Sequence, residues 1–420
     1  MGARWCGIDW SESRHDVVLV DEHGRAVVRV KITEDPAGVA HLLGILTGAV
    51  QAGEDPVPVA IETPHGLLVA ALRSAGVTVY AINPLAVARY RQRHSMAGRK
   101  SDYTDALTLA NILRTDAHQF RPMPADSEEA LALTVLARAH QDAVWRRTRS
   151  VRELRSVLRL YFPGFLEAFG PRLAHLYAPD ARTVLALAPT PAHAAALTQP
   201  VVEQRLRRAG RSRNVAARAA AVVRVFVQPR LRQPREVENA YAERALCSLA
   251  TLDAECDSVA HLDRKVVAAF TRHPDYRIVA SFPGLGRILG ARVLAEIGDD
   301  PTRFASPRNL KAFAGSAPIT RASGKTVTIV HRYIKNRRLA AAGYQWATTA
   351  AMTYPPARLH YRQRREHGDT HAAALRHLFS KMLGQLHHCL QHRETYVPDK
   401  AWPPARSPPP QREQSDSTHR

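Results

Sequence analysis

Hydrophobic residues alternate with polar ones, or cluster in short runs, through the first hundred residues, and this pattern predicts a sheet with helices. The predicted strands are residues 4–10, 15–20, 25–32, 57–62 and 77–82. Apolar residues at helical spacing predict helices at 36–50, 66–75 and 84–94, and a further helix opens at Asp102. The chain therefore begins with three antiparallel strands and continues with alternating helices and strands.

This order is the ribonuclease H-like α/β arrangement, in which the first strand lies centrally beside the fourth. Asp9 and Glu62 stand at or near the carboxyl ends of these two strands, where open α/β sheets place their sites. Asp102 and Asp105 start a helix and project from one of its faces. The four carboxylates would converge where this helix crosses the sheet edge. The alternative is that the helical aspartates only cap their helix, and that Asp9 and Glu62 are ordinary turn or strand-end charges.

A cluster of four carboxylates would have a chemical consequence. Like charges at short range repel and raise one another's pKa values unless cations lie between them. Carboxylate oxygens are the ligands that Mg²⁺ or Mn²⁺ prefers, and two such ions can clamp the attacking and leaving oxygens of a phosphodiester. We therefore expect Asp9, Glu62, Asp102 and Asp105 to be metal-binding and catalytic residues.

Two long helical patterns, at residues 125–161 and 237–271, predict a helical hairpin or coiled coil, and an oligomerisation arm is one use for it. Between them, residues 201–235 contain ten arginines and one acid, Glu203. Arginine grips phosphate without reading base sequence, whereas a solvated helix face, the alternative, normally interleaves acids. The arginines expected to bind nucleic acid are Arg205, Arg207, Arg208, Arg211 and Arg213.

A Pro-Gly-x-Gly turn at residues 283–286 joins two predicted helices in a helix-hairpin-helix pattern. Gly284 and Gly286 would let backbone amides approach a phosphate at a helix N-terminus. A plain helical turn is the alternative.

Ser323 lies in a turn of small residues flanked by Arg321 and Lys325. A serine hydroxyl becomes a nucleophile when a base or a metal activates it, and nearby cations stabilise charge on a phosphoryl group. A turn serine that bonds its own backbone is the alternative. The Ser-Gly-Lys-Thr sequence also resembles a nucleotide-binding phosphate loop. Ile319 replaces the glycine required five positions before Gly324, which argues against an ATPase.

The end of the chain carries one more helical pattern, at residues 370–393, with His387, His388, Cys389 and His392. These side chains fit the polar face of the helix better than a zinc site, because no second ligand pair has motif spacing. The Pro-rich and charged composition of residues 396–420 predicts a disordered tail.

Composition narrows the class of partner. The 420 residues carry a net charge of +21, and eight of the 59 basic residues are lysines. A GC-rich genome explains the preference for arginine but not the excess over acids, so a polyanionic partner is expected, with nucleic acid the leading candidate. The four cysteines form no CxxC pair and no apolar run approaches the ~20 residues of a membrane span, so we expect a cytoplasmic protein.

Several motifs, in one order, resemble the DEDD transposases of the IS-one-ten family. They are Gly7-Ile8-Asp9-Trp10, Glu62-Thr63-Pro64-His65-Gly66, Lys100-Ser101-Asp102-Tyr103-Thr104-Asp105-Ala106, Pro283-Gly284-Leu285-Gly286 and residues 318–325. The resemblance spans roughly residues 4–390. Many relatives carry a doubled serine and a doubled glycine where this chain has Ala322-Ser323-Gly324-Lys325, so one serine is nominated here, with Ser316 and Thr320 as alternatives.

The resemblance implies a domain order and a chemistry. The domains would be a RuvC-like DEDD domain at 1–122, a basic helical and coiled-coil region at 123–272 and a mainly helical C-terminal transposase domain at 273–395. The implied activity is recombination of insertion sequences, with Mg²⁺ at the four acids and attack by Ser323 on DNA to give a covalent phosphoserine. The implied partners are donor and target DNA, a structured bridge RNA that guides the reaction, and further copies of the chain in a dimer or tetramer.

Two other hypotheses compete with this one. The first is a hydrolytic RuvC-like junction nuclease, in which water attacks the phosphate and Ser323 is only structural. The second is a nucleic-acid-binding protein without activity, which the intact set of carboxylates opposes.

Overall fold

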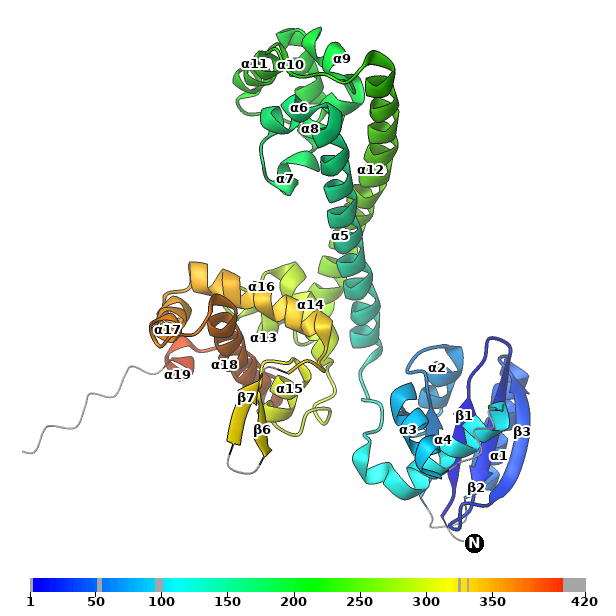
Figure 1. The fold of residues 1–420 in the computed structure, drawn as a ribbon. Coiled ribbons are helices and arrows are strands. Elements are labelled where there is room, and N and C mark those ends of the chain that lie inside the picture. The colour runs from blue at the N-terminus through cyan, green and yellow to red at the C-terminus, as the bar shows by residue number, and fades with distance from the viewer. Residues whose placement is uncertain (1–2, 51–54, 95–100, 324–325, 331, 403–420) are drawn as a thin grey trace, which may run out of the picture. The chain divides into compact units, whose positions relative to one another are not determined.

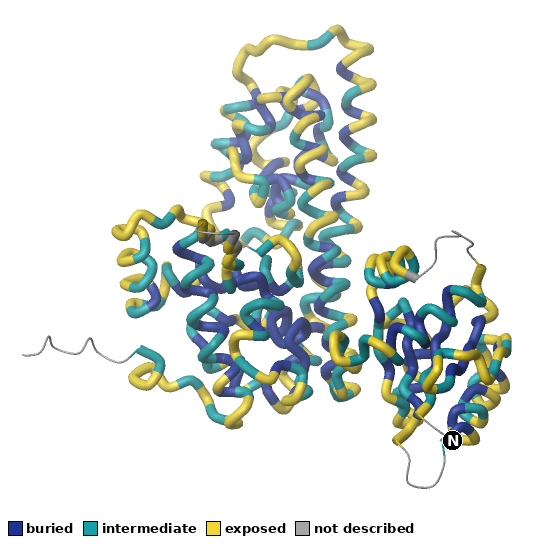
Figure 2. The backbone as a smooth tube through the Cα atoms, turned by 60° about the horizontal axis from the view of Figure 1, so that its bottom comes forward, coloured by how far each residue is buried: buried dark blue, intermediate teal, exposed yellow. Residues whose placement is uncertain are grey.

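The computed structural model describes residues 3–50, 55–94, 101–323, 326–330 and 332–402. Contacts divide the chain into two compact units, residues 1–125 (unit 1) and 126–420 (unit 2), and each is described by itself (Figure 1). Buried stretches lie inside each unit beneath exposed and intermediate residues (Figure 2). Within the described ranges, none of the helices is long and apolar enough to cross a membrane.

Unit 1 is built on a five-stranded mixed sheet with the order β3-β2-β1-β4-β5. The strands are β1 (Trp5–Asp9), β2 (Arg14–Val20), β3 (Ala26–Thr33), β4 (Val59–Ile61) and β5 (Val79–Ala81). The first three are antiparallel, whereas β1 pairs with β4 and β4 with β5 in parallel. The prediction that the first strand lies centrally beside the fourth is confirmed.

Helices cover both faces of this sheet (Figure 1). They are α1 (Pro36–Gly48) and α2 (Leu67–Ser74) on one face, and α3 (Pro84–His94) and α4 (Asp102–Asp116), followed by the 3₁₀ turn η1 (Ala117–Gln119), on the other. Successive strand residues serve opposite faces: Val17 and Leu19 pack in the core under α1 and α2, and Val18 and Val20 pack against α4. The central strands β1, β2 and β4 are therefore buried on both sides, whereas the edge strand β3 is largely exposed.

A glycine lets α4 lie directly on β1. A Cβ atom at Gly7 would stand 2.0 Å from the carbonyl oxygen of Ala106 and 2.5 Å from the amide nitrogen of Ala110, both in the α4 backbone. Protein interiors are too closely packed to absorb such an overlap, so a side chain there would push the helix away from the strand. Gly7 thus sets the distance between the strand that ends at Asp9 and the helix that begins at Asp102.

Unit 2 contains two long antiparallel helices, α5 (Glu128–Tyr161) and α12 (Arg235–Arg272), which lie side by side as the predicted helical hairpin (Figure 1). The shorter helices that connect α5 to α12 in the chain pack against one end of this helical hairpin and form a hydrophobic core with it. They are α6 (Pro163–Phe169), α7 (Leu173–Leu176), α8 (Pro179–Leu187), α9 (Pro191–Ala195), α10 (Gln199–Arg208) and α11 (Val215–Phe226).

The C-terminal part of unit 2 is mainly helical, as predicted, and packs around the fully buried Trp346. Its helices are α13 (Tyr276–Ala280), α14 (Arg287–Ile297), α15 (Pro307–Phe313), α16 (Arg337–Thr353), α17 (Pro355–Glu366), α18 (His371–His392) and α19 (Pro398–Ala401). A two-stranded antiparallel hairpin, β6 (Ile319–Ser323) and β7 (Thr326–Val330), lies between α15 and α16.

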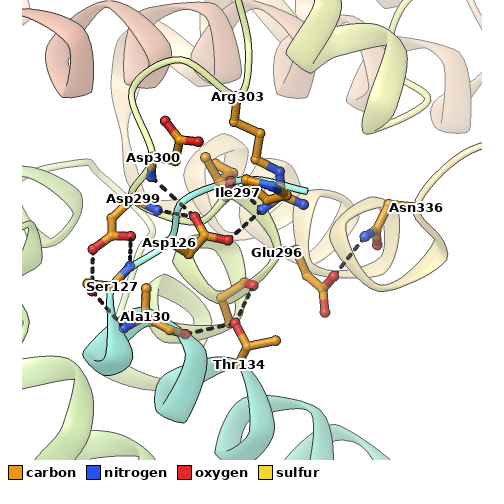
Figure 3. Close-up of polar contacts among 12 residues, drawn as sticks. Asp126, Ser127, Ala130, Thr134, Glu296, Ile297, Asp299, Asp300, Arg303 and Asn336 are labelled. Carbon is orange, nitrogen blue, oxygen red and sulfur yellow. Dashed lines mark hydrogen bonds and ion pairs between the residues drawn. The ribbon is translucent and has the colours of Figure 1, made fainter. Parts of the chain in front are cut away.

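Polar contacts bind the start of α5 to the end of α14 (Figure 3). Asp126 Oδ1 accepts hydrogen bonds from the backbone amides of Asp299 and Asp300 at 3.0 and 3.2 Å. In return, the amide and hydroxyl of Ser127 donate to the Asp299 carboxylate at 2.9 and 2.5 Å. These reciprocal bonds tie the first turn of the helical hairpin to the C-terminal helices.

A buried ion pair strengthens the same junction. The Arg138 guanidinium donates two 2.8 Å hydrogen bonds to the carboxylate of Glu296, which also accepts from Asn336 Nδ2 at 2.7 Å. These bonds hold the pKa of Glu296 below its usual value although burial alone would raise it. The helical hairpin and the C-terminal helices are thereby parts of one unit.

Two segments depart from what the sequence patterns predicted. The residues before and after Ser323 form strands rather than a simple turn, and Ser323 pairs with Thr326. Residues 398–401, assigned to a disordered tail, form α19, because the indole of Trp402 donates to the hydroxyl of Tyr396 at 2.7 Å and Gln385 Nε2 donates to the carbonyl of Ala401 at 2.7 Å. Residues 403–420 of that tail lie outside the described residues.

Candidate active site

Asp9 and Glu62 end neighbouring strands. β1 and β4 run parallel with Ile8 opposite Ile61, and each carboxylate residue directly follows that pair. Two parallel strands in this register bring their carboxyl ends to the same edge of the sheet. Asp9 and Glu62 therefore occupy matching positions at that edge.

Asp102 and Asp105 belong to the first turn of α4, but they do not cap it. The cap is Ser101, whose hydroxyl accepts from the amide of Thr104 at 3.3 Å, while the Thr104 hydroxyl accepts from the amide of Ser101 at 2.9 Å. This reciprocal capping box satisfies the backbone amides of Thr104 and Ser101. The two aspartates are thus not needed for capping, and Asp105 is only 7% exposed.

The pKa of Asp9 reflects the acidic residues around it. Burial, followed in decreasing order by the charges of Asp105, Asp102 and Glu62, raises the pKa of Asp9 to about 6. These are the other three acids of the predicted cluster, which we call the acidic cluster. Each of them is close enough to disfavour the charged form of Asp9.

Asp16 and Lys31 of this region were missed in the sequence, and so was the carboxylate partner of Arg91. Asp16 stands opposite Asp9 in the β1–β2 register and also raises its pKa, while Lys31 Nζ lies 3.1 Å from Asp16 Oδ2. Arg91 Nη2, from α3, donates to Asp105 Oδ1 at 2.5 Å. The sequence offered only a basic run around residue 91 and gave no sign of which carboxylate it would meet.

The acidic cluster suits a hard divalent cation in its chemistry. All its side-chain donors are carboxylate oxygens, the ligand type that Mg²⁺ and Mn²⁺ prefer, and their mutual repulsion is what a cation would relieve. Within the described ranges, no three acidic, histidine or cysteine side chains are already grouped to hold one ion. The Arg91 guanidinium supplies positive charge to Asp105 instead.

Ser323 ends β6 in the hairpin of β6 and β7, which we call the serine hairpin. The neighbouring Ala322 and Thr326 are exposed. The side chains of Ser323 and Arg321 and the whole of Lys325 lie outside the described residues. The backbone thus places Ser323 beside the tip of a two-stranded hairpin.

The two glycines of the predicted helix-hairpin-helix turn have different surroundings. Gly284 has φ +82°, and a Cβ there would lie 3.0 Å from the amide nitrogen of Ala350 in α16, so its glycine is explained by packing. The carbonyl of Pro283 accepts from the Trp346 indole at 2.9 Å. Gly286, at the start of α14, has open space where a Cβ would be. Packing therefore accounts for glycine at position 284, whereas the phosphate contact expected at Gly286 stays a prediction.

The arginines predicted to bind nucleic acid lie on and after α10. Arg207, Arg208 and Arg213 are exposed, and Arg205 is half-buried. Arg211 Nε donates to Asp180 Oδ2 at 2.5 Å and joins α8 to the loop after α10. Three of the five are thus exposed, although Arg207 Nη2 also lies 3.9 Å from Glu203 Oε2, whereas Arg211 is half-buried in its ion pair.

Comparisons with known proteins identify the family. A family model described as a transposase matches residues 6–163, the range that holds the acidic cluster. A second, described as transposase of the IS116/IS110/IS902 family, matches residues 276–362, which include the serine hairpin. The chain belongs to this transposase family. The resemblance to IS-one-ten transposases is confirmed.

Relatives of the transposase align along nearly its whole length. It is 52% identical over 400 residues to the "Mini-circle putative transposase for IS117" of Streptomyces coelicolor, covering 95% of this chain and 97% of the relative. It is 28% identical to a 44.8 kDa protein of insertion element IS116 from Streptomyces clavuligerus, covering 94% and 96%. A 42 kDa protein of insertion element IS900 from Mycobacterium paratuberculosis is 27% identical, with coverage of 94% and 97%.

Proposed function

We propose that this transposase cuts and rejoins DNA through a covalent serine intermediate, using the acidic cluster of an RNase H-like domain and the serine hairpin together. The observation that carries the proposal is the electrostatics of Asp9, whose pKa is raised by all three of the other motif acids. Carboxylates gathered against their own repulsion are costly to keep, which marks a functional site. The family supplies the substrate class, since a transposase acts on DNA.

Asp9, Glu62, Asp102 and Asp105 are the residues that would hold Mg²⁺ or Mn²⁺. When bound, such ions supply positive charge to the oxygens of a reacting phosphodiester. The chain's own contribution is positional: Gly7 fixes the spacing of β1 and α4, and Ser101, not Asp102 or Asp105, caps α4. Arg91 would leave Asp105 when a cation binds there.

Ser323 is the proposed nucleophile. Its hydroxyl oxygen forms a bond to phosphorus, and the bond between that phosphorus and one flanking sugar oxygen breaks. The serine proton leaves, and the departing sugar oxygen takes up a proton. Rejoining reverses these changes with the hydroxyl of another strand end, so the energy of the phosphodiester is kept and no ATP is required.

The net charge of +21 and the exposed Arg207, Arg208 and Arg213 support a polyanionic partner, which the reacting DNA supplies. A structured guide RNA is proposed as a second partner because the family resemblance implies it. The hairpin of α5 and α12 is the proposed surface for pairing with another copy of the chain.

The test is Ser323→Ala in the full-length protein, with a duplex carrying an element end. A protein–DNA adduct that survives denaturing gel electrophoresis should form with the unchanged protein and fall at least ~10³-fold in the variant, the loss expected when a nucleophile is removed. Thr320→Val, on the same strand, should keep the adduct. An adduct that persists in Ser323→Ala would refute the assignment, and strands that are cut but never joined to protein would favour the hydrolytic junction nuclease.

A further inference from the structure

A small cavity lies at the foot of the serine hairpin. Its volume is about 150 Å³, and it is lined by the segment before β6, the segment after β7, and helices α16 and α18. The polar side chains among its described lining are Ser316, Lys335, Tyr344 and Arg376. The cavity is therefore attached to the element that carries Ser323.

The charge of this cavity is of one sign. Lys335 and Arg376 come from different elements, and none of the described residues that line the cavity is acidic. The Tyr344 hydroxyl, held 3.3 Å from His371 Nε2, adds a polar group to the wall, whereas the Ser316 hydroxyl donates away to a backbone carbonyl. Two cationic residues in one lining that has no described carboxylate favour an anion.

The chain builds Lys335 into this position. Gly315 has φ +72°, and a Cβ there would lie 2.2 Å from Lys335 Cδ, so glycine is required both for the backbone conformation and for the room that the lysine stem occupies. The amide of Asn336 donates to the carbonyl of Phe313 at 2.8 Å and fixes the adjoining backbone on α15. The lysine is thus placed by packing.

Size and reach indicate what the anion is. Cavities that enclose drug-sized molecules start at roughly 300 Å³, so this one suits a single phosphate group. The four residue steps of β6 span about 14 Å, which equals about four base steps along a DNA duplex. Beside Lys335, the side chain of Ile334 is 91% exposed, an apolar surface that the fold leaves uncovered. A strand that follows the hairpin can reach both Ser323 and the cavity.

We infer that the cavity binds a backbone phosphate of the DNA strand that is attacked at Ser323, a few nucleotides from the reacting phosphate. Lys335 and Arg376 are then positioning residues that set which phosphate meets the serine. This inference rests on the proposed function of the serine hairpin for the identity of the strand. Its binding component does not depend on the serine hydroxyl.

The experiment compares Lys335→Gln, Arg376→Gln and the double variant in the full-length protein. The dissociation constant for a fluorescent element-end duplex is measured by anisotropy at several salt concentrations. Each single change should weaken binding about 5- to 20-fold, and the double variant should lose about one unit of the slope of log K against log salt, as expected for one phosphate contact. Arg362→Gln, an exposed arginine of α17 outside the cavity, should stay within about twofold of the unchanged protein.

The outcomes separate this inference from the proposed function. A double variant with unchanged affinity and salt slope would overturn the phosphate site, and so would a loss confined to RNA of the same sequence. Binding is also measured in the Ser323→Ala background, where the same losses are expected. Persistence of the adduct in Ser323→Ala would refute the nucleophile but leave the phosphate site standing. Lys335→Arg, which keeps the charge, should retain affinity and excludes a loss caused by misfolding.

Discussion

The acidic cluster and the serine hairpin are supported by the fold in opposite ways. Asp9 ends a central strand on which α4 lies in direct backbone contact, and Asp105 is nearly buried. Ser323 ends one strand of a two-stranded sheet, and Thr326 and Thr328 on the other strand are exposed. Like charges need rigid packing to stay together, whereas the proposed nucleophile would have to be accessible to a DNA strand. The acidic cluster is thus held in a tightly packed part of the fold, whereas the serine hairpin is accessible to solvent.

The largest expected effect on stability breaks the packing under the acidic cluster. Gly7→Ala places a Cβ against the α4 backbone and should destabilise unit 1 by about 1–3 kcal/mol, the usual cost of overpacking. Urea unfolding of the full-length protein, followed by circular dichroism, measures this loss.

Two further substitutions calibrate the effect. Gly44→Ala, in α1 with open space around its Cβ, should be neutral or stabilise by up to ~1 kcal/mol. Thr328→Ala, exposed on the serine hairpin, should change stability by less than ~0.5 kcal/mol. Equal losses for Gly7→Ala and Thr328→Ala would contradict the contrast between the two elements.

A smaller effect concerns Arg91. The Arg91→Gln change removes the cation bound to Asp105, so the acidic cluster should attract divalent ions more strongly, by about tenfold in Kd or ~1.4 kcal/mol. Mn²⁺ binding followed by electron paramagnetic resonance measures this without DNA or turnover. Arg93→Gln, an exposed neighbour on α3, serves as the matched control. Unchanged or weaker Mn²⁺ affinity in Arg91→Gln would show that Arg91 and the ion do not compete.

The smallest effect is a pH dependence of stability in chelator. The pKa of Asp9 is about 6 in the folded protein and 3.8 ordinarily, so between these values the folded state keeps a proton that the unfolded state has lost. This contribution is fully present below about pH 4 and is lost as the pH rises through 6. Allowing for solvent screening of a half-exposed group, it amounts to about 1 kcal/mol.

The Asp9→Asn variant isolates that contribution. Its stability should exceed that of the unchanged protein at pH 7 and should lack the decline between pH 4 and 6, because the amide carries no charge for the other acids to repel. Thermal unfolding from pH 4 to 7 in the presence of chelator tests both points. Parallel curves for the two proteins would mean that the acids do not interact with Asp9 as the structure indicates.

Much of the acidic cluster could be predicted because it depends on the order of elements. The apolar run of β1, the alternation in β3 and the buried run of β4 indicate the order of the strands, and parallel pairing then brings Asp9 and Glu62 to one edge. Arg91 could not be assigned to Asp105, since the periodicity of α3 states which face is polar but not which carboxylate lies opposite.

The region around Ser323 was harder to predict. Small residues at 322–324 favour a turn, and the β-branched residues of Thr326–Val330 were the available sign of a strand. Thr326–Val330 pairs with Ile319–Ser323 in one particular register, and the local sequence gives only a weak indication of that register. The short helix at 398–401 depends on Trp402 and Tyr396. The contacts of these two residues with the preceding helices could not be predicted from a local sequence pattern.

The sequence by itself determined the family motifs, the order of strands and helices in unit 1, the long helical hairpin and the basic character of the chain, because periodicity and composition act locally. Only the tertiary structure decided that Gly7 seats α4, that Arg91 neutralises Asp105, and that Lys335 and Arg376 face one cavity. Each of these depends on two segments meeting at a fixed distance. That distance is set by the packing of side chains in the hydrophobic cores, and no single stretch of the sequence determines it.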